Sequence, residues 1–340
     1  MAAQGNRAYG YNQSGRETMN VLVIVLQLLV LLVVVLLHVA YATYFERKVI
    51  GHMQMRMGPT RVGWLGLLQP IADGIKSFFK EDIIPSAADK PIFMLAPIIC
   101  LVPAFASLAI LPWAEGWALS NINIGLLFVF AMSSLGGYGV VLAGWASNSK
   151  FSFLGGLRAS AQVISYEIAM GLSLVGVMLL SGSLNLGDIV AAQGDSFFGM
   201  FAFRQCIGFF IFCVAMLAET NRVPFDLPEA ESELVSGYCT EYSGMRYALF
   251  FMAEYTSMFV MATVGVVCFL GGWRGPVEVG FFPPFWLVLK VYGVMFFFFW
   301  VRATLPRYRY DQLMALGWKV LIPLALFNIV ITALGKALAS

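Results

Sequence analysis

Apolar residues are gathered along this chain in eight long runs, which polar stretches separate. The hydrocarbon core of a bilayer is about 30 Å thick, and a helix needs about 20 apolar residues to cross it. A chain in lipid must satisfy its own backbone hydrogen bonds, so each run is expected to be helical. The pattern predicts transmembrane helices near residues 19–44, 92–111, 122–146, 157–180, 200–218, 245–270, 285–303 and 313–334.

The fold class predicted from these runs is an all-α membrane protein with about eight transmembrane helices. The first 18 residues are polar and rich in Gly and Asn. The apolar run that begins at Met19 is too long for the core of a signal peptide, and no small-residue cleavage site is evident. We therefore expect a polar extension over residues 1–18, followed by a single membrane domain over residues 19–340.

A further helix is predicted in the loop that follows the first crossing. Between Trp64 and Lys80, apolar residues including Ile71 and Ile75 recur at helical spacing, and Asp73 and Lys76 share the opposite side. This segment is too polar to cross a bilayer. Its pattern is typical of an amphipathic helix that lies in the membrane interface, although a plain surface helix would show the same spacing.

Composition agrees with a membrane protein and excludes several other classes. Hydrophobic residues make up 60% of the chain and charged residues 12%, whereas soluble domains have about 25% charged residues. The net charge of +2 gives no sign of a nucleic-acid partner. The five cysteines lack the spacing of a metal or Fe–S site, and two histidines are too few to suggest a transmembrane haem. We expect this chain to bind no metal.

The distribution of Lys and Arg predicts an orientation. Most of these residues lie in the loops after the first, third, fifth and seventh helices. Cytoplasmic loops carry an excess of positive residues, so we expect the odd-numbered loops in the cytoplasm and both termini on the periplasmic side of a bacterial inner membrane.

Charged residues inside the predicted helices are the main candidates for chemistry. Glu167, Glu254 and Lys290 lie within apolar runs, and Glu219 ends one. An intramembrane charge is costly unless it is paired or hydrated, and such residues usually mark an ion or proton path. The alternative is structural pairing, for example of Lys290 with a carboxylate.

The loop after the fifth helix is acidic. Between Glu219 and Glu241 it carries six acids and one arginine, and Pro224 and Pro228 hold part of it out of a helix. Crowded carboxylates repel one another, so their pKa values should rise and couple. This suits proton relay, although a solvated acidic loop is the alternative.

Four long stretches carry a resemblance to a known family. They read ERKVIGHMQMRMGPTRVGWLGLLQPIADGIKSFFKED from Glu46, GWASNSKFSFLGGLRASAQVISYE from Gly144, AETNRVPFDLPEAESELVSGYCTEYSGMRYALFFMAEY from Ala218, and WVRATLPRYRYDQLM from Trp300. The sequence resembles the quinone-site membrane subunit of the proton-pumping NADH–quinone oxidoreductase, respiratory complex I. The resemblance extends over most of the chain from the first helix onward.

The resemblance implies a membrane component that forms a quinone entrance and part of a quinone cavity, and that couples quinone reduction to proton translocation. Quinone, expected to be ubiquinone, would be a substrate, and this chain would bind no cofactor. Flavin and Fe–S clusters would lie in partner subunits, which include the hydrophilic-arm subunits at the quinone site and small membrane subunits.

The resemblance also implies roles for particular residues. The proton-coupling chain would comprise Glu219, Glu254 and Glu167, in that order. The quinone passage and cavity would be lined by two groups of residues, one in the first loop and one in the acidic loop: Glu46, Arg47, Arg56, Arg61 and Asp73, together with Asp226, Glu229, Glu231 and Glu233.

Two other functions stay open from sequence. A membrane component of a related hydrogenase or formate-hydrogenlyase complex would share the superfamily, and quinone-dependent activity would separate the two. A stand-alone secondary transporter usually shows internal repeats and broken helices in both halves, and we find no such symmetry in this sequence.

Overall fold

The computed structural model describes residues 5–194, 199–227, 235–276 and 282–339. Within these ranges, seven helical segments are long and apolar enough to cross a membrane, which confirms an all-α membrane protein. They are α1 (Gly5–Met53, with its candidate span at Val25–Met53), α3 (Lys90–Leu108), α4 (Gly125–Ala146), α5 (Lys150–Ser181), α10 (Gly244–Phe269), α11 (Phe282–Thr304), and the continuous run of α12 (Tyr310–Ala315), the π-helical η4 (Leu316–Leu321) and α13 (Ile322–Ala339).

Where the sequence predicts one helix near residues 200–218, the structure has two shorter ones. α7 (Phe201–Arg204) and α8 (Cys206–Glu219) are separated at Gln205, whose φ of −123° and ψ of 44° are not helical. The side chain of Gln205 is buried. Its amide nitrogen donates to Thr332 at 2.7 Å, and its amide oxygen accepts from Asn328 at 2.8 Å. Polar contacts with α13 therefore accompany a break that an apolar pattern does not reveal.

The helix predicted in the first loop is present as α2 (Gln69–Phe79), preceded by the short helix η1 (Trp64–Gly66). It begins later than the pattern suggests because Gly63, Leu65 and Gly66 have positive φ angles of 74°, 54° and 84°. None of the α2 residues is buried, and its apolar residues Ile71 and Ile75 are exposed. The helix is amphipathic and presents an apolar row at the surface.

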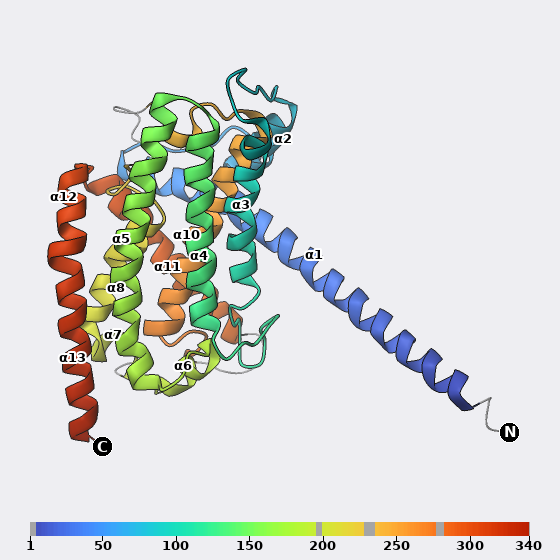
Figure 1. Cartoon of the computed structure of the whole chain (residues 1–340), viewed down its shortest axis with the longest axis vertical. Coiled ribbons are helices and arrows are strands. Elements are labelled where there is room, and N and C mark those ends of the chain that lie inside the picture. The colour runs from blue at the N-terminus through green and yellow to red at the C-terminus, as the bar shows by residue number, and fades with distance from the viewer. Residues whose placement is uncertain (1–4, 195–198, 228–234, 277–281, 340) are drawn as a thin grey trace.

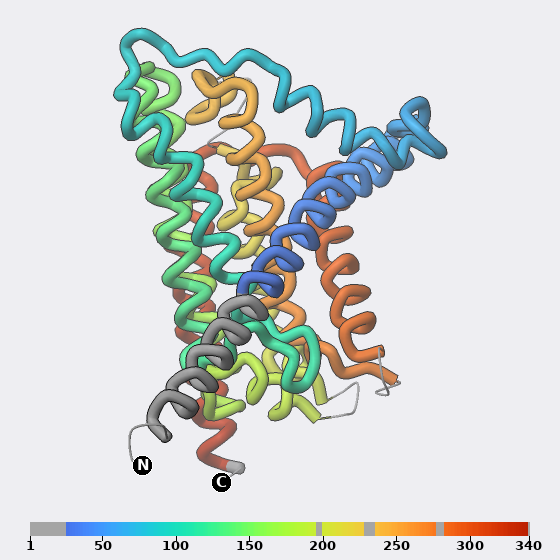
Figure 2. The backbone as a smooth tube through the Cα atoms, turned by 90° about the vertical axis from the view of Figure 1, so that its right-hand side faces the viewer, coloured from blue at the N-terminus to red at the C-terminus, as the bar shows by residue number. Residues whose placement is uncertain are grey.

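The long helices form a bundle with α2 at one end (Figure 1). The last turn of α13 and the short helix α6 (Leu186–Ala192) lie at the opposite end (Figure 1). Helix α1 is inclined to the other helices (Figure 1), and its C-terminal part crosses them near α2 (Figure 2). This crossing brings the last turns of α1 to the charged site described below.

Small residues allow the helices of the bundle to approach closely. A Cβ atom at Gly139 in α4 would lie 2.8 Å from the backbone nitrogen of Cys100 in α3 and closer still to its sulfur. One at Gly144 would lie 2.6 Å from the carbonyl oxygen of Ser152 in α5. Membrane helices pack largely through such contacts because lipid provides no hydrophobic drive for association.

Candidate functional site

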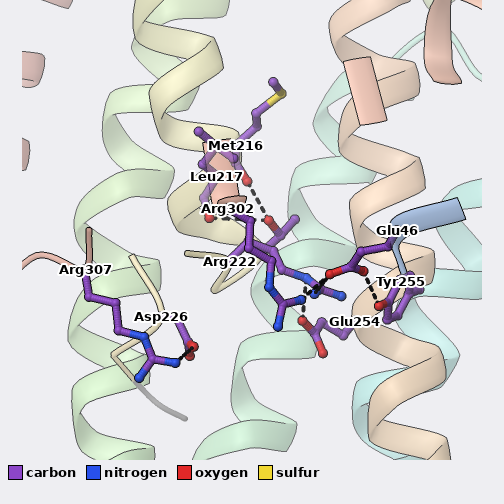
Figure 3. A network of polar contacts seen from close by, with 10 residues as sticks. Glu46, Met216, Leu217, Arg222, Asp226, Glu254, Tyr255, Arg302 and Arg307 are labelled. Atoms are coloured by element: carbon purple, nitrogen blue, oxygen red, sulfur yellow. Dashed lines mark hydrogen bonds and ion pairs between the residues drawn. The ribbon is translucent and has the colours of Figure 1, made fainter. Parts of the chain in front are cut away.

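Four elements bring charged side chains to one point under the α2 end of the bundle. Glu46 comes from α1, Glu254 and Tyr255 from α10, and Arg302 from α11 (Figure 3). Arg222 comes from the turn that follows α8. These residues are far apart in the sequence and meet because α1 crosses α10 and α11 near its C-terminal end.

Arg222 links two carboxylates. Its Nη1 lies 3.4 Å from Oε1 of Glu46, and its Nε lies 2.7 Å from Oε1 of Glu254. Glu46 also accepts hydrogen bonds from Arg302 and from the hydroxyl of Tyr255. The side chains of Glu46 and Arg222 are only 5% and 7% exposed. Buried charges require such pairing, because each unpaired ion would pay a large desolvation cost.

The environment of Arg222 keeps it charged. Burial alone would lower the pKa of Arg222, but the attraction of Glu254 and its anionic neighbours outweighs burial and raises the pKa well above its ordinary value. The guanidinium group also lies over the ring of Tyr255, with 4.4 Å from Cζ to the ring centroid. A permanent cation therefore separates the carboxylates of Glu46 and Glu254.

The loop that follows Arg222 is held by an ion pair and by hydrogen bonds to its backbone. Nη2 of Arg307 lies 3.1 Å from Oδ2 of Asp226. The amide nitrogen of the buried Gln162 donates to the carbonyls of Ala218 at 2.7 Å and Phe225 at 2.8 Å. Two acids of this loop, Glu219 and Asp226, have different partners. The chain turns between them, and Glu219 hydrogen-bonds to Ser133 whereas Asp226 pairs with Arg307.

Beside this network lies a cavity of about 80 Å³ that both Glu254 and Glu219 line. Oε2 of Glu219 and Oδ1 of Asn221 are buried, and neither has a hydrogen-bond partner among the described residues. Buried polar atoms are normally satisfied by protein or by ordered water, and a water needs only about 10–15 Å³ of such space. The cavity has room for several waters between the two carboxylates.

Glu167 joins this group from α5. Ser133 donates to Glu219 at 2.5 Å, and the next residue, Ser134, donates to Glu167. Glu167 is also close enough to Glu219 to interact with it electrostatically. Two adjacent serines of α4 thus place the carboxylates of α5 and α8 side by side.

Of the first-loop candidates, Glu46 belongs to the buried network, and the others lie apart from it. Nη1 of Arg47 forms an ion pair of 2.6 Å with Asp73, which attaches α2 to α1, and these side chains are 50% and 39% exposed. Arg56 and Arg61 are exposed on the loop before α2. Glu229, Glu231 and Glu233 lie outside the described residues.

Lys290, the cation predicted inside the seventh apolar run, contacts backbone carbonyls. Its Nζ donates to the carbonyls of Leu270, Gly272 and Arg274, at 2.7, 3.1 and 2.7 Å. These carbonyls follow the end of α10, where backbone acceptors lack helical partners. The ammonium group is therefore held by backbone at the end of the bundle opposite the carboxylate network.

Sequence reasoning missed the residues that complete the network. Arg222, Tyr255, Arg302 and Ser133 all contact a predicted carboxylate. The signal for Arg222 was its position as the one cation in an acidic loop, and for Ser133 the Ser-Ser pair inside an apolar run. Within the described residues, no three His, Cys, Asp or Glu side chains are placed to hold a metal ion.

The fold and the site define a multi-pass membrane protein with a buried network of paired charges near one end of the helix bundle. The model of the NADH dehydrogenase family matches residues 26–333. The chain is 54% identical to an NADH-quinone oxidoreductase H subunit of Geobacter metallireducens, over 96% of this chain and 99% of that protein. It is 53% identical to the corresponding H subunit of Paramagnetospirillum magneticum, over 92% of each chain. The chain belongs to this family of NADH–quinone oxidoreductase membrane subunits.

Proposed function

We propose that this chain forms the membrane side of a quinone cavity in an NADH–quinone oxidoreductase and couples quinone reduction to proton translocation. Relatives that match nearly the whole chain carry the name of that enzyme's H subunit. Quinone, expected to be ubiquinone, is then the substrate. Flavin and Fe–S clusters belong to partner subunits of the hydrophilic arm.

The observation that carries the proposal is the continuity between the ion network and the cavity. Glu254 belongs to both, because it pairs with Arg222 and also lines the cavity that reaches Glu219. A change of charge near Glu46 would change the relative strengths of the two ion pairs that Arg222 forms, one with Glu46 and one with Glu254. At about 4 Å and an effective dielectric constant of about 20, one such interaction is worth about 4 kcal/mol. That compares with about 2.3 kcal/mol for moving one charge against 100 mV.

The contacts suggest a revised order for the coupling chain. The sequence-based order began at Glu219 and passed through Glu254 to Glu167. Glu254 is the member that touches the ion network, whereas Glu219 and Glu167 bond to neighbouring serines of α4. We therefore propose the order Glu254, Glu219, Glu167, with water in the cavity between the first two.

The quinone would enter from the bilayer beside α2. The exposed apolar row of α2 suits contact with an isoprenoid tail, and the ion pair of Arg47 with Asp73 keeps this helix beside α1. In this proposal Arg56, Arg61 and the residues Glu229, Glu231 and Glu233 belong to the same passage and its partner-facing loops. The α2 end of the bundle would face the cytoplasm of a bacterium, since it carries most of the Lys and Arg residues.

The proposal is tested by removing the titratable charge while keeping side-chain size. In the assembled complex, Glu254→Gln and Glu219→Gln should each lose quinone reduction and proton pumping together, because tightly coupled steps stop as one. Glu81→Gln, an exposed acid on the same side of the bundle, serves as the matched control and should keep both activities. Full pumping by an assembled Glu219→Gln, Glu254→Gln double variant would contradict the coupling role.

Two further measurements distinguish an NADH–quinone oxidoreductase from a related hydrogenase complex and from a stand-alone transporter. When no artificial acceptor is added, membranes that contain the wild-type complex should oxidise NADH only if a quinone is available as acceptor. Purification from mild detergent should recover flavin and Fe–S subunits with this chain. Recovery of the chain alone, in active form, would instead favour a stand-alone transporter.

A further inference from the structure

Asn221 lies at the end of α8, at a position that most often holds glycine. Its φ angle is +51°. Its backbone nitrogen donates to the carbonyl of Ala218 at 3.2 Å, and the nitrogen of Arg222 donates to the carbonyl of Leu217 at 3.2 Å. These two bonds are the turn that commonly ends a helix with one residue in the left-handed conformation. Glycine adopts this conformation without steric cost, and Asn tolerates it. The turn therefore does not require an amide side chain at this position.

The side chain of Asn221 has a place of its own beside the coupling carboxylates. Together with Glu219 and Glu254 it lines the cavity of about 80 Å³. Its Oδ1 is buried and has no hydrogen-bond partner among the described residues, and the same is true of Oε2 of Glu219. An amide oxygen accepts hydrogen bonds, as does an ionised carboxylate. Two neighbouring acceptors therefore lack a donor.

The other hydroxyl groups beside Glu219 do not supply this donor. The hydroxyl of Thr220 donates to the carbonyl of Met216 at 2.9 Å, and that of Ser133 donates to Oε1 of Glu219 at 2.5 Å. Each hydroxyl has a single hydrogen to donate. The donor that Oδ1 of Asn221 and Oε2 of Glu219 need must therefore come from a bound molecule.

Water has the chemistry that this place requires. It carries two hydrogens, one for each of the two acceptor oxygens, and a buried water typically makes about three hydrogen bonds. Ser257 lies three residues after Glu254 on α10 and lines the same cavity, so its hydroxyl offers a further polar contact on the α10 side. The cavity exceeds the space of about 10–15 Å³ that one water needs.

We propose that Asn221 is a positioning residue for proton transfer, which fixes a water molecule beside Glu219 in this cavity. The inference rests on the function proposed above. The water donates one hydrogen to Oδ1 of Asn221 and the other to Oε2 of Glu219. A proton that arrives from the side of Glu254 bonds to the water oxygen, while the hydrogen that faces Glu219 passes to the carboxylate. One O–H bond forms and one breaks, so the water is regenerated.

The amide determines which hydrogen of the water moves. Because Oδ1 of Asn221 holds one hydrogen, the other one points at Glu219. Without the amide, the cavity still admits water, but the water has no fixed orientation. Proton transfer to Glu219 then waits for a molecule that happens to be oriented correctly. The loss of one hydrogen bond should lower the fraction of correctly placed water about tenfold.

A matched pair of glycine variants tests this role. Asn221→Gly removes the amide and keeps the turn, since glycine accepts a positive φ angle. Asn148→Gly is the control. Asn148 follows the end of α4, is exposed, and has a φ angle of +47°. Its amide donates to the carbonyl of Ala87 at 3.1 Å, and it does not line the cavity. The two variants therefore make the same change in the same backbone conformation.

Quinone reduction and proton pumping of the assembled complex are measured in H2O and in D2O. Asn221→Gly should lower both rates about tenfold and should raise the ratio of the rate in H2O to the rate in D2O, because proton transfer becomes limiting. Asn148→Gly should leave the rates and the ratio unchanged. A wild-type rate in Asn221→Gly would overturn the proposal. A lower rate with an unchanged ratio would also overturn it, because a purely structural defect does not depend on the isotope.

A map of the complex that shows ordered waters tests the site without activity. In the wild type, density should lie within hydrogen-bonding distance of Asn221 and Glu219, and in Asn221→Gly it should be absent. An empty cavity in the wild type would contradict the proposal. This result differs from a failure of the proposed function, which would appear as full pumping by the Glu219→Gln, Glu254→Gln double variant whether or not the water is present.

Discussion

Replacing Arg222 by glutamine should destabilise the protein far more than replacing Arg302 by glutamine. Both arginines contact Oε1 of Glu46, so the two variants remove a partner from the same atom. Their burial differs, because the side chain of Arg222 is 7% exposed and that of Arg302 is 38% exposed. Arg222 also pairs with Glu254, whose side chain is 17% exposed.

The magnitudes follow from this difference in burial. Removing one partner of a buried ion pair leaves an uncompensated charge and costs about 3–5 kcal/mol. An ion pair that reaches solvent is worth at most about 1 kcal/mol. The two variants should therefore differ by about 3 kcal/mol in the free energy of unfolding, which corresponds to on the order of a hundredfold in the equilibrium constant.

The assay is thermal denaturation of the complex in one detergent, followed by size-exclusion chromatography of what remains folded. Arg222→Gln should denature several degrees below Arg302→Gln. Adding Glu254→Gln to Arg222→Gln should recover part of the loss, because it removes the stranded carboxylate. Equal denaturation temperatures for the two single variants, or no recovery in the double variant, would refute the assignment of Arg222 as the buried link.

Three further outcomes are expected. With the native cysteines replaced, Thr60→Cys should label only from the cytoplasmic side and Ser120→Cys only from the other; labelling of both from one side would overturn the orientation. Arg47→Ala should lower quinone reductase activity but spare NADH oxidation with an artificial acceptor, and equal loss of both would argue against a local quinone role. Gly139→Ala should lower the free energy of unfolding by about 1–3 kcal/mol through overpacking, since the added Cβ would lie 2.8 Å from a backbone nitrogen of α3. Gly171→Ala is its control, because a Cβ there meets open space and should stabilise α5 slightly.

The sequence alone determined the class of this protein. Runs of apolar residues predict transmembrane helices because each residue in lipid must be apolar or paired, and that requirement is local. The amphipathic pattern of α2 is local in the same way. The carboxylates Glu167, Glu219 and Glu254 could be singled out because a charge inside an apolar run is costly wherever its partners lie.

Only the tertiary structure decided which charges meet. Glu46, Arg222, Glu254 and Arg302 come from four separate elements, and no spacing along the chain relates them. The break at Gln205 and the carbonyl partners of Lys290 also depend on contacts between distant helices. Pairing energies fall with distance in space and with exposure to water. Both the distance between two charges and their exposure depend on how the helices cross. The sequence therefore identifies candidate residues, and the packing of α1 against α10 and α11 determines which of them form the network.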